Sequence, residues 1–87
     1  MSLAQIETFV AVAETGNVSR ASVRLHVAQP ALSRQIRSLE DELGAALFAR
    51  TARGMKLLPS GELFLAHARR ILEAVDAARV AVRSPRS

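Results

Sequence analysis

The side chains best suited to binding nucleic acid gather on one face of the segment from Val27 to Leu43. If this segment is a helix, Ser33, Arg34 and Arg37 share its outer face with Pro30, near the N-terminal end. Guanidinium groups match the acceptor pairs of guanine edges and of phosphates. The pattern favours a helix that reads DNA, although an ordinary surface helix with scattered charges would have a similar composition.

The same segment has the apolar periodicity of an amphipathic helix. Its apolar stripe, with steps of four, three and four residues, consists of Leu32, Ile36, Leu39 and Leu43. Pro30 fits the first turn and Gly44 follows as a C-terminal stop. Because Ala28 is a poor N-cap, we expect the first amides of the helix to be left for another acceptor, such as a phosphate.

Two helices are predicted before this one. The first runs from Ser2, a plausible N-cap, to Thr15, and Gly16 ends it. The second follows Asn17 as its N-cap and continues to about His26. Only two or three residues then remain before the next helix, so we expect a helix-turn-helix at about 18–37, with a turn that lacks glycine.

The segment 47–57 has a different pattern. Short apolar ends flank a basic turn that contains glycine, which is typical of a two-stranded hairpin. A hairpin beside a helix-turn-helix is a wing, and Arg50 or Arg53 at its tip could enter a narrow minor groove. The alternative is a solvated basic loop.

Residues 59 to about 84 are predicted to form the longest helix, which begins at Pro59 after Leu58, an N-cap without a side-chain oxygen. An apolar seam nearly three heptads long runs along this helix, and we expect it to pair with a second copy in a two-fold dimer. The alternative is that the helix folds back on its own domain. The predicted dimer contacts are Phe64, Ala68, Ile71, Leu72, Val75, Ala78 and Val82.

Composition and charge agree with a polyanionic partner. The net charge is +4, and residues 17–58 hold seven basic side chains against three acidic ones. A GC-rich genome would also enrich arginine. Three Phe, with no Tyr or Trp, disfavour the stacking used to bind single strands and RNA. The chain has no cysteine, no long apolar run and no signal-peptide pattern, so we expect a cytoplasmic protein without membrane segments.

Catalysis and metal binding find little support in the sequence. His26 and His67 are far apart, there is no glycine-rich phosphate loop, and Glu40, Asp41 and Glu42 are consecutive instead of converging. We therefore expect neither an enzyme nor a cofactor or metal site. The serious alternative to DNA binding is a winged helix that binds protein, with the long helix as its oligomerisation element.

The chain resembles the N-terminal DNA-binding region of the LysR-type bacterial transcriptional regulators. The resemblance covers almost the whole chain and rests on four segments: FVAVAETGNVSRAS (9–22), LHVAQPALSRQIRSLEDELG (25–44), LFARTARG (47–54) and the LLPSG…HARRIL run (57–72). It implies a mainly α fold, with a winged helix-turn-helix of three helices and a hairpin over 1–58. A linker helix and tail over 59–87 would hold two such domains on one interrupted dyad in double-stranded DNA.

Carried over by position, the resemblance implies base or phosphate contacts in the major groove from the start of the reading helix. It also implies wing contacts around Arg53, and contacts near the DNA backbone from Asn17 and Ser19. The predicted DNA contacts are Asn17, Ser19, Gln29, Pro30, Ala31, Ser33, Arg34, Arg37, Arg50, Thr51 and Arg53.

Members of the family usually add a C-terminal domain that binds a small-molecule effector. That domain is absent from these 87 residues, so we expect a fragment of a longer regulator or a natural short form. Three positions depart from the family pattern: Ser22 in place of Ala, Ala28 in place of Ser, and Leu58 in place of Thr. The last two imply weaker helix starts, and the Ser22 hydroxyl needs a partner if it is buried.

Overall fold

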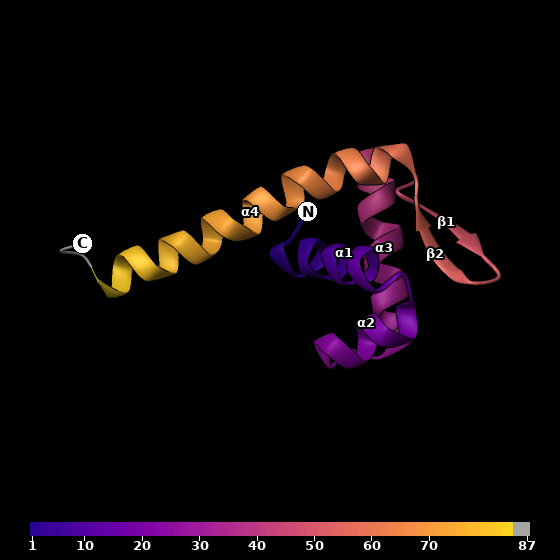
Figure 1. Ribbon diagram of the computed structural model, residues 1–87, viewed down its shortest axis with the longest axis horizontal. Coiled ribbons are helices and arrows are strands. Elements are labelled where there is room, and N and C mark those ends of the chain that lie inside the picture. Colours follow the sequence, from indigo (N-terminus) through magenta and orange to yellow (C-terminus); the bar gives the residue numbers. More distant parts are fainter. Residues whose placement is uncertain (85–87) are drawn as a thin grey trace.

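The computed structural model describes residues 1–84, which form four helices and one hairpin. The elements are α1 (Leu3–Thr15), α2 (Val18–Leu25), α3 (Gln29–Leu43), β1 (Phe48–Thr51), β2 (Gly54–Leu57) and α4 (Pro59–Arg83). Helices α1, α2 and α3 pack together, the hairpin projects from this body, and α4 crosses it and extends away (Figure 1). The predicted order of elements is therefore confirmed. The predicted tail at 85–87 lies outside the described residues.

The first two helices begin at the predicted caps. The Ser2 hydroxyl accepts a hydrogen bond from the Gln5 amide at 3.1 Å, and the Gln5 side chain accepts one from the Ser2 amide at 2.9 Å. This reciprocal pair satisfies donors that a helix start otherwise leaves open. The Asn17 side chain caps α2, because its Oδ1 accepts from the Arg20 amide at 3.0 Å.

The turn between α2 and α3 takes its left-handed residue from a histidine. Helix α2 ends at Leu25, one residue earlier than expected, and His26 has φ 56°. Histidine tolerates this conformation better than most side chains, which explains how the turn forms without glycine. The Ser22 hydroxyl donates to the Ser19 carbonyl at 2.7 Å, so this departure from the family pattern has a hydrogen-bond partner.

One core joins the helices to the hairpin. Its largest fully buried side chains are Phe9, Leu32, Leu39, Leu47 and Val12. The Phe9 ring of α1 lies 5.3 Å from the Phe48 ring of β1 and 5.0 Å from the Phe64 ring of α4, with the second pair edge to face. Such pairs add to the stabilisation from buried area alone. The ring contacts therefore fix the hairpin and α4 on α1.

The predicted stripe of α3 is correct for three of its four residues. Leu32 and Leu39 are fully buried and Ile36 is nearly so, but Leu43 is 36% exposed. Including Leu43 was wrong, because the last turn of α3 extends past the core. There the neighbouring Glu42 carboxylate pairs with the N-terminal ammonium of Met1 at 2.6 Å.

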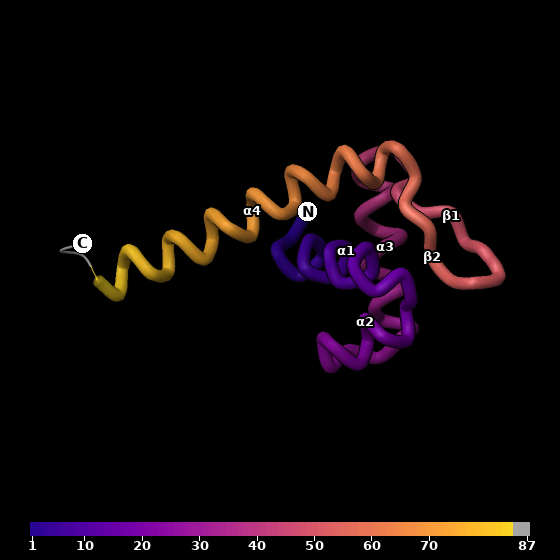
Figure 2. Tube along the Cα trace, viewed as in Figure 1, coloured from indigo at the N-terminus to yellow at the C-terminus, as the bar shows by residue number. Residues whose placement is uncertain are grey.

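Helix α4 is only partly covered by the rest of the chain. Figure 2 shows its C-terminal half leaving the body, and the molecule measures 51 × 25 × 19 Å along its principal axes. Burial follows this arrangement: Ala68 is fully buried and Ile71 is half-buried, whereas Val80 and Val82 are 61% and 80% exposed. None of the described helices has both the length and the apolar composition that a membrane crossing needs.

Candidate nucleic-acid interface

The outer face of α3 presents most of the predicted reading residues to solvent. Gln29, Pro30, Arg34 and Arg37 are exposed. Ser33 and Ala31 are half-buried, so Ser33 lies at the border of this face and not on it, in contrast to the prediction. The first two turns of α3 therefore combine a buried stripe with an accessible polar edge, which is the arrangement that a groove-reading helix requires.

The start of α3 lacks a side-chain cap, as predicted. Ala28 is the N-cap residue and makes no capping hydrogen bond, and Pro30 lies in the first turn. The amide groups of a helix start, together with the helix dipole, favour an anion at this position. The Gln29 side chain also donates to the Ser19 hydroxyl at 2.9 Å. This hydrogen bond joins the start of α3 to α2.

The tip of the hairpin is basic, exposed and internally braced. Arg50, Thr51 and Arg53 are all exposed. The Thr51 hydroxyl donates to the Gly54 carbonyl at 3.0 Å and accepts from the Arg53 amide at 3.2 Å. These two bonds close the turn between β1 and β2, so the arginines project from an ordered tip.

The hairpin is also fixed to the helix-turn-helix, which the sequence did not predict. The Met55 amide of β2 donates to the Gly16 carbonyl at 3.1 Å. A Cβ atom on Gly54, which has φ 128°, would lie 2.4 Å from that same carbonyl oxygen, so glycine is required there. At the start of β1, the Glu40 carboxylate of α3 accepts from the amides of Leu47, which precedes the strand, and Phe48 at 2.6 and 3.3 Å.

These anchors create a groove between the start of α2 and the hairpin. It has a volume of about 310 Å³, and its polar lining comes from Asn17, Ser19, Arg50 and Thr51. The sequence placed these residues in two separate segments, and the structure brings them together. Arg34 instead lines a second hollow of about 370 Å³ with Gln5, Gln35 and Ser38. The sequence did not predict that Gln5 of α1 and Ser38 of α3 lie beside Arg34, although Ser38 follows Arg34 by one helical turn.

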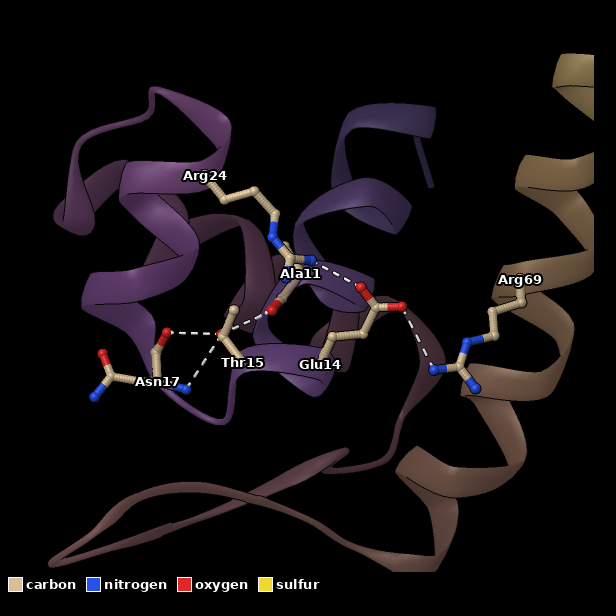
Figure 3. Close-up of polar contacts among 6 residues, drawn as sticks. All are labelled: Ala11, Glu14, Thr15, Asn17, Arg24 and Arg69. Carbon is tan, nitrogen blue, oxygen red and sulfur yellow. Dashed lines mark hydrogen bonds and ion pairs between the residues drawn. The ribbon is translucent and has the colours of Figure 1, made fainter.

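An ion-pair cluster beside the helix-turn-helix was also missed. Glu14 of α1 accepts a hydrogen bond from Arg24 of α2 at 2.7 Å and one from Arg69 of α4 at 3.5 Å (Figure 3). We call these three residues the Glu14 cluster. The hydrogen bond from Arg24 and a smaller contribution from Arg69 lower the pKa of Glu14, against the opposing effect of burial. Residues 10 and 55 positions apart form this cluster, so no local pattern indicates it.

The predicted dimer seam divides into two parts. Ala68 has no exposed surface within the single chain, and the Phe64 ring packs on Phe9, so these two residues belong to the chain's own core. Assigning Ala68 to a dimer contact was wrong, because it has no surface left to bury. The rest of the seam becomes steadily more accessible: Ile71, Leu72 and Val75 are half-buried, and Ala78 and Val82 are exposed.

Residues 1–84 contain no group of three or more acidic or histidine side chains placed to hold a metal ion. The charged groups of the candidate interface are arginines. This surface therefore has the chemistry to bind an anionic polymer by hydrogen bonding and charge.

Comparison with known proteins supports this description. Residues 3–62 match the family described as the bacterial regulatory helix-turn-helix protein, lysR family. The chain is 51% identical over 87 residues to the HTH-type transcriptional regulator TfdS of Cupriavidus pinatubonensis, covering 95% of this chain and 30% of TfdS. It is 46% identical over 84 residues to the regulator ClcR of Pseudomonas putida, covering 97% of this chain and 29% of ClcR. The chain thus spans less than a third of the length of these relatives.

Solved structures agree with the fold. The structure of the CbnR DNA-binding domain in complex with DNA superimposes with a TM-score of 0.93 at 42% identity and covers 100% of both chains. The complex of the BenM DNA-binding domain with the catB site 1 DNA gives a TM-score of 0.94 at 39% identity and covers 100% of this chain and 98% of the other. Both the predicted winged helix-turn-helix fold and the predicted resemblance are thereby confirmed. The chain belongs to the lysR family of bacterial regulatory helix-turn-helix proteins, which are DNA-binding transcription regulators and not enzymes.

Proposed function

We propose that this chain binds double-stranded DNA sequence-specifically, as a homodimer on an interrupted dyad, and so regulates transcription. The observation that carries the proposal is the exposed basic edge of α3, together with the polar groove shared by α2 and the hairpin, which a hydrogen bond from Gln29 to Ser19 joins to the start of α3. Two solved neighbours, those of CbnR and BenM, are complexes of the corresponding domain with DNA, which supports the same role.

In this proposal the first two turns of α3 enter the major groove. Arg34 and Arg37 offer guanidinium forks, and Gln29 offers an amide that matches an adenine edge. Pro30, Ala31 and Ser33 lie close enough along the helix to contact thymine methyl groups or phosphates. The uncapped amides at the start of α3 bind a backbone phosphate, because the helix dipole favours an anion there.

The groove between α2 and the hairpin binds the DNA backbone beside the major groove. Asn17 and Ser19 lie at the start of α2, while Arg50 and Thr51 lie at the end of β1. Arg53 at the tip reaches the adjacent minor groove, where the negative potential attracts arginine. Phosphate contacts of this kind set the position of the protein on the duplex, and base contacts from α3 set the sequence.

The homodimer forms through the uncovered part of α4. Residues 1–58 serve as the DNA-binding unit and 59–87 as the linker helix with its tail, although the first turns of α4 also complete the core of that unit. Ile71, Leu72, Val75, Ala78 and Val82 offer the apolar face to a second copy. A small-molecule effector would act only through a further domain outside this chain, and the protein would act on DNA in the bacterial cytoplasm.

Selection from a random duplex pool tests the proposal without knowledge of the operator. The 87-residue chain is expected to enrich duplexes with two inverted half-sites at one fixed separation. Enriched sequences should bind with a steep dependence on salt, because arginine contacts with phosphates release counterions. If no sequence is enriched after repeated rounds, sequence-specific DNA binding is excluded, and a protein partner becomes the better explanation of the basic face.

A further inference from the structure

The Glu14 cluster connects the two parts of the molecule that a dimeric DNA-binding protein must hold at a fixed angle. Arg24 belongs to the helix-turn-helix, Arg69 belongs to the linker helix, and Glu14 lies between them at the end of α1 (Figure 3). The end of α1 is itself fixed, because the Thr15 hydroxyl lies 2.8 Å from the Ala11 carbonyl and 3.0 Å from the Asn17 carbonyl. One carboxylate therefore contacts two helices from a braced position.

The other directional contacts of α4 with the body lie at its start. There the Ser60 hydroxyl donates to the Ala46 carbonyl, and the Phe64 ring packs edge to face on Phe9. Further along the helix, Ala68, Ile71 and Leu72 hold α4 by apolar packing, which is favourable but not directional. Among residues 1–84, the bond from Arg69 to Glu14 is the only ion pair between α4 and the rest of the chain. From Arg69 the helix continues for roughly 21 Å to its end at Arg83, at 1.5 Å per residue. A small rotation at Arg69 becomes a large displacement at the far end.

We propose that Glu14 is a positioning residue that sets the angle between α4 and the helix-turn-helix, and thereby selects the separation of the half-sites that the dimer recognises. This inference rests on the dimeric DNA binding proposed above. In a two-fold dimer each α4 carries one DNA-binding unit, so the exit angle of α4 determines the distance between the two α3 helices. Glu14 does not contact DNA in this account. It acts through the orientation of α4.

The test compares the charge-removing variants Glu14→Gln and Arg69→Gln with wild type. Glu14→Gln keeps an acceptor of similar size but loses the ionic pairing with both arginines. Arg69→Lys keeps the positive charge and serves as the conservative rescue. Arg70→Gln is the matched control, because Arg70 is the exposed neighbour of Arg69 on α4 and forms no ion pair with residues 1–84. Arg24 is left unchanged, since it lies beside the proposed DNA contacts of α2.

The probes are the duplex enriched by the wild type, the same duplex with one base pair added or removed between the half-sites, and a duplex with a single half-site. For Glu14→Gln and Arg69→Gln we expect unchanged affinity for the single half-site. The preference of these variants for the original spacing should fall about two- to fivefold, the size expected for an exposed ion pair. Arg69→Lys and Arg70→Gln should keep the wild-type spacing preference.

A distance measurement provides a second readout that does not depend on affinity. The chain has no cysteine, so a spin label on a single Glu7→Cys substitution reports the distance between the two α1 helices of the dimer. Glu14→Gln should broaden this distance distribution, and Arg70→Gln should not.

Two results would overturn the inference, and they differ in meaning. If the wild type prefers one spacing and both charge-removing variants keep the same preference and distance distribution, the role of Glu14 is wrong and the proposed function stands. If the wild type enriches no sequence or binds all spacings equally, the proposed function fails, and the inference fails with it.

Discussion

Helices α3 and α4 have similar apolar patterns but use them differently. In both helices apolar residues recur at steps of three and four. In α3, Leu32, Ile36 and Leu39 are all buried within the chain. In α4, Ala68 is fully buried, but the same seam continues to Val82, which is 80% exposed. The comparison teaches that a periodic stripe predicts which face of a helix is apolar, and not what covers that face.

The polar faces of the two helices differ as well. The outer face of α3 carries Arg34 and Arg37, and the acidic residues of the helix lie near its other end. On α4, acidic and basic side chains are interspersed along the exposed surface, as in Arg70, Glu73 and Arg79. A segregated basic edge suits a polyanion, whereas mixed charges are typical of a solvated surface. The two helices are thus suited to different partners.

The largest expected effect tests whether α3 is held by the chain's own core. Leu39→Ala removes a fully buried side chain and should lower the free energy of unfolding by about 2–5 kcal/mol, measured by urea denaturation. Leu43→Ala is the control on the same helix. Because Leu43 is 36% exposed, this substitution should lower the free energy of unfolding by less than about 1 kcal/mol. Equal losses for the two variants would contradict the assignment of the stripe.

The next effect tests whether the free part of α4 forms the dimer. Ala78→Asp places a charge in the apolar seam at a position that is exposed in the single chain. We expect the dissociation constant of the dimer to rise about a hundredfold, because two carboxylates would be buried across the two-fold axis. This rise corresponds to a loss of roughly 2.7 kcal/mol in the free energy of dimerisation. Sedimentation equilibrium measures this change. Ala77 is also exposed but lies outside the seam, rotated by roughly 100° from Ala78 around the helix. Ala77→Asp should therefore leave the dimer intact, and a similar loss for both variants would remove the seam from the interface.

A smaller effect is expected at the polar face of α3. Arg34→Ala should weaken binding to the selected duplex by about 1–3 kcal/mol if Arg34 contacts a base edge. The free energy of unfolding should not change, because Arg34 is exposed. Binding to a scrambled duplex provides the control, since it depends on phosphates alone. If affinity falls equally for both duplexes, Arg34 contacts the backbone and does not read sequence.

The smallest effect concerns the uncapped start of α3. Ala28→Ser adds a hydroxyl that can accept from a first-turn amide, and should raise the free energy of unfolding by about 0.5–1 kcal/mol. Thermal and urea unfolding measure the gain, with Ala77→Ser as a control in a helix interior. No gain at Ala28 would mean that water already satisfies these amides as well as a side chain can.

Local features of this fold were predictable from the sequence. Ser2 and Asn17 cap their helices, Gly16 and Gly44 end theirs, and the hairpin lies where a basic turn separates two apolar ends. These features depend on residues within a few positions of one another, so the sequence states them directly. The outer face of α3 was predictable for the same reason, since helical spacing alone separates Arg34 from Leu32.

Contacts between distant segments were not predictable. The carboxylate of Glu40 holds the start of β1, and Glu14 joins α2 to α4. In the sequence, however, Glu40 is part of an acidic run, and no pattern indicates a role for Glu14. The close approach of Gly54 to Gly16 was missed for the same reason. The boundary between the buried and free parts of α4 also depends on the Phe9 and Phe64 rings meeting in space. Periodicity specifies faces of elements, while packing decides which faces meet.

The most direct test of the central claim is a fluorescence-anisotropy titration of the selected duplex, its single half-site and a scrambled duplex, over a range of salt concentrations. We predict two chains per selected duplex, much weaker binding to the half-site, and a steep salt slope, because two α3 helices and two hairpins would contact phosphates. Equal and weak binding to all three duplexes would contradict the claim that α3 reads DNA in a dimer held together by α4.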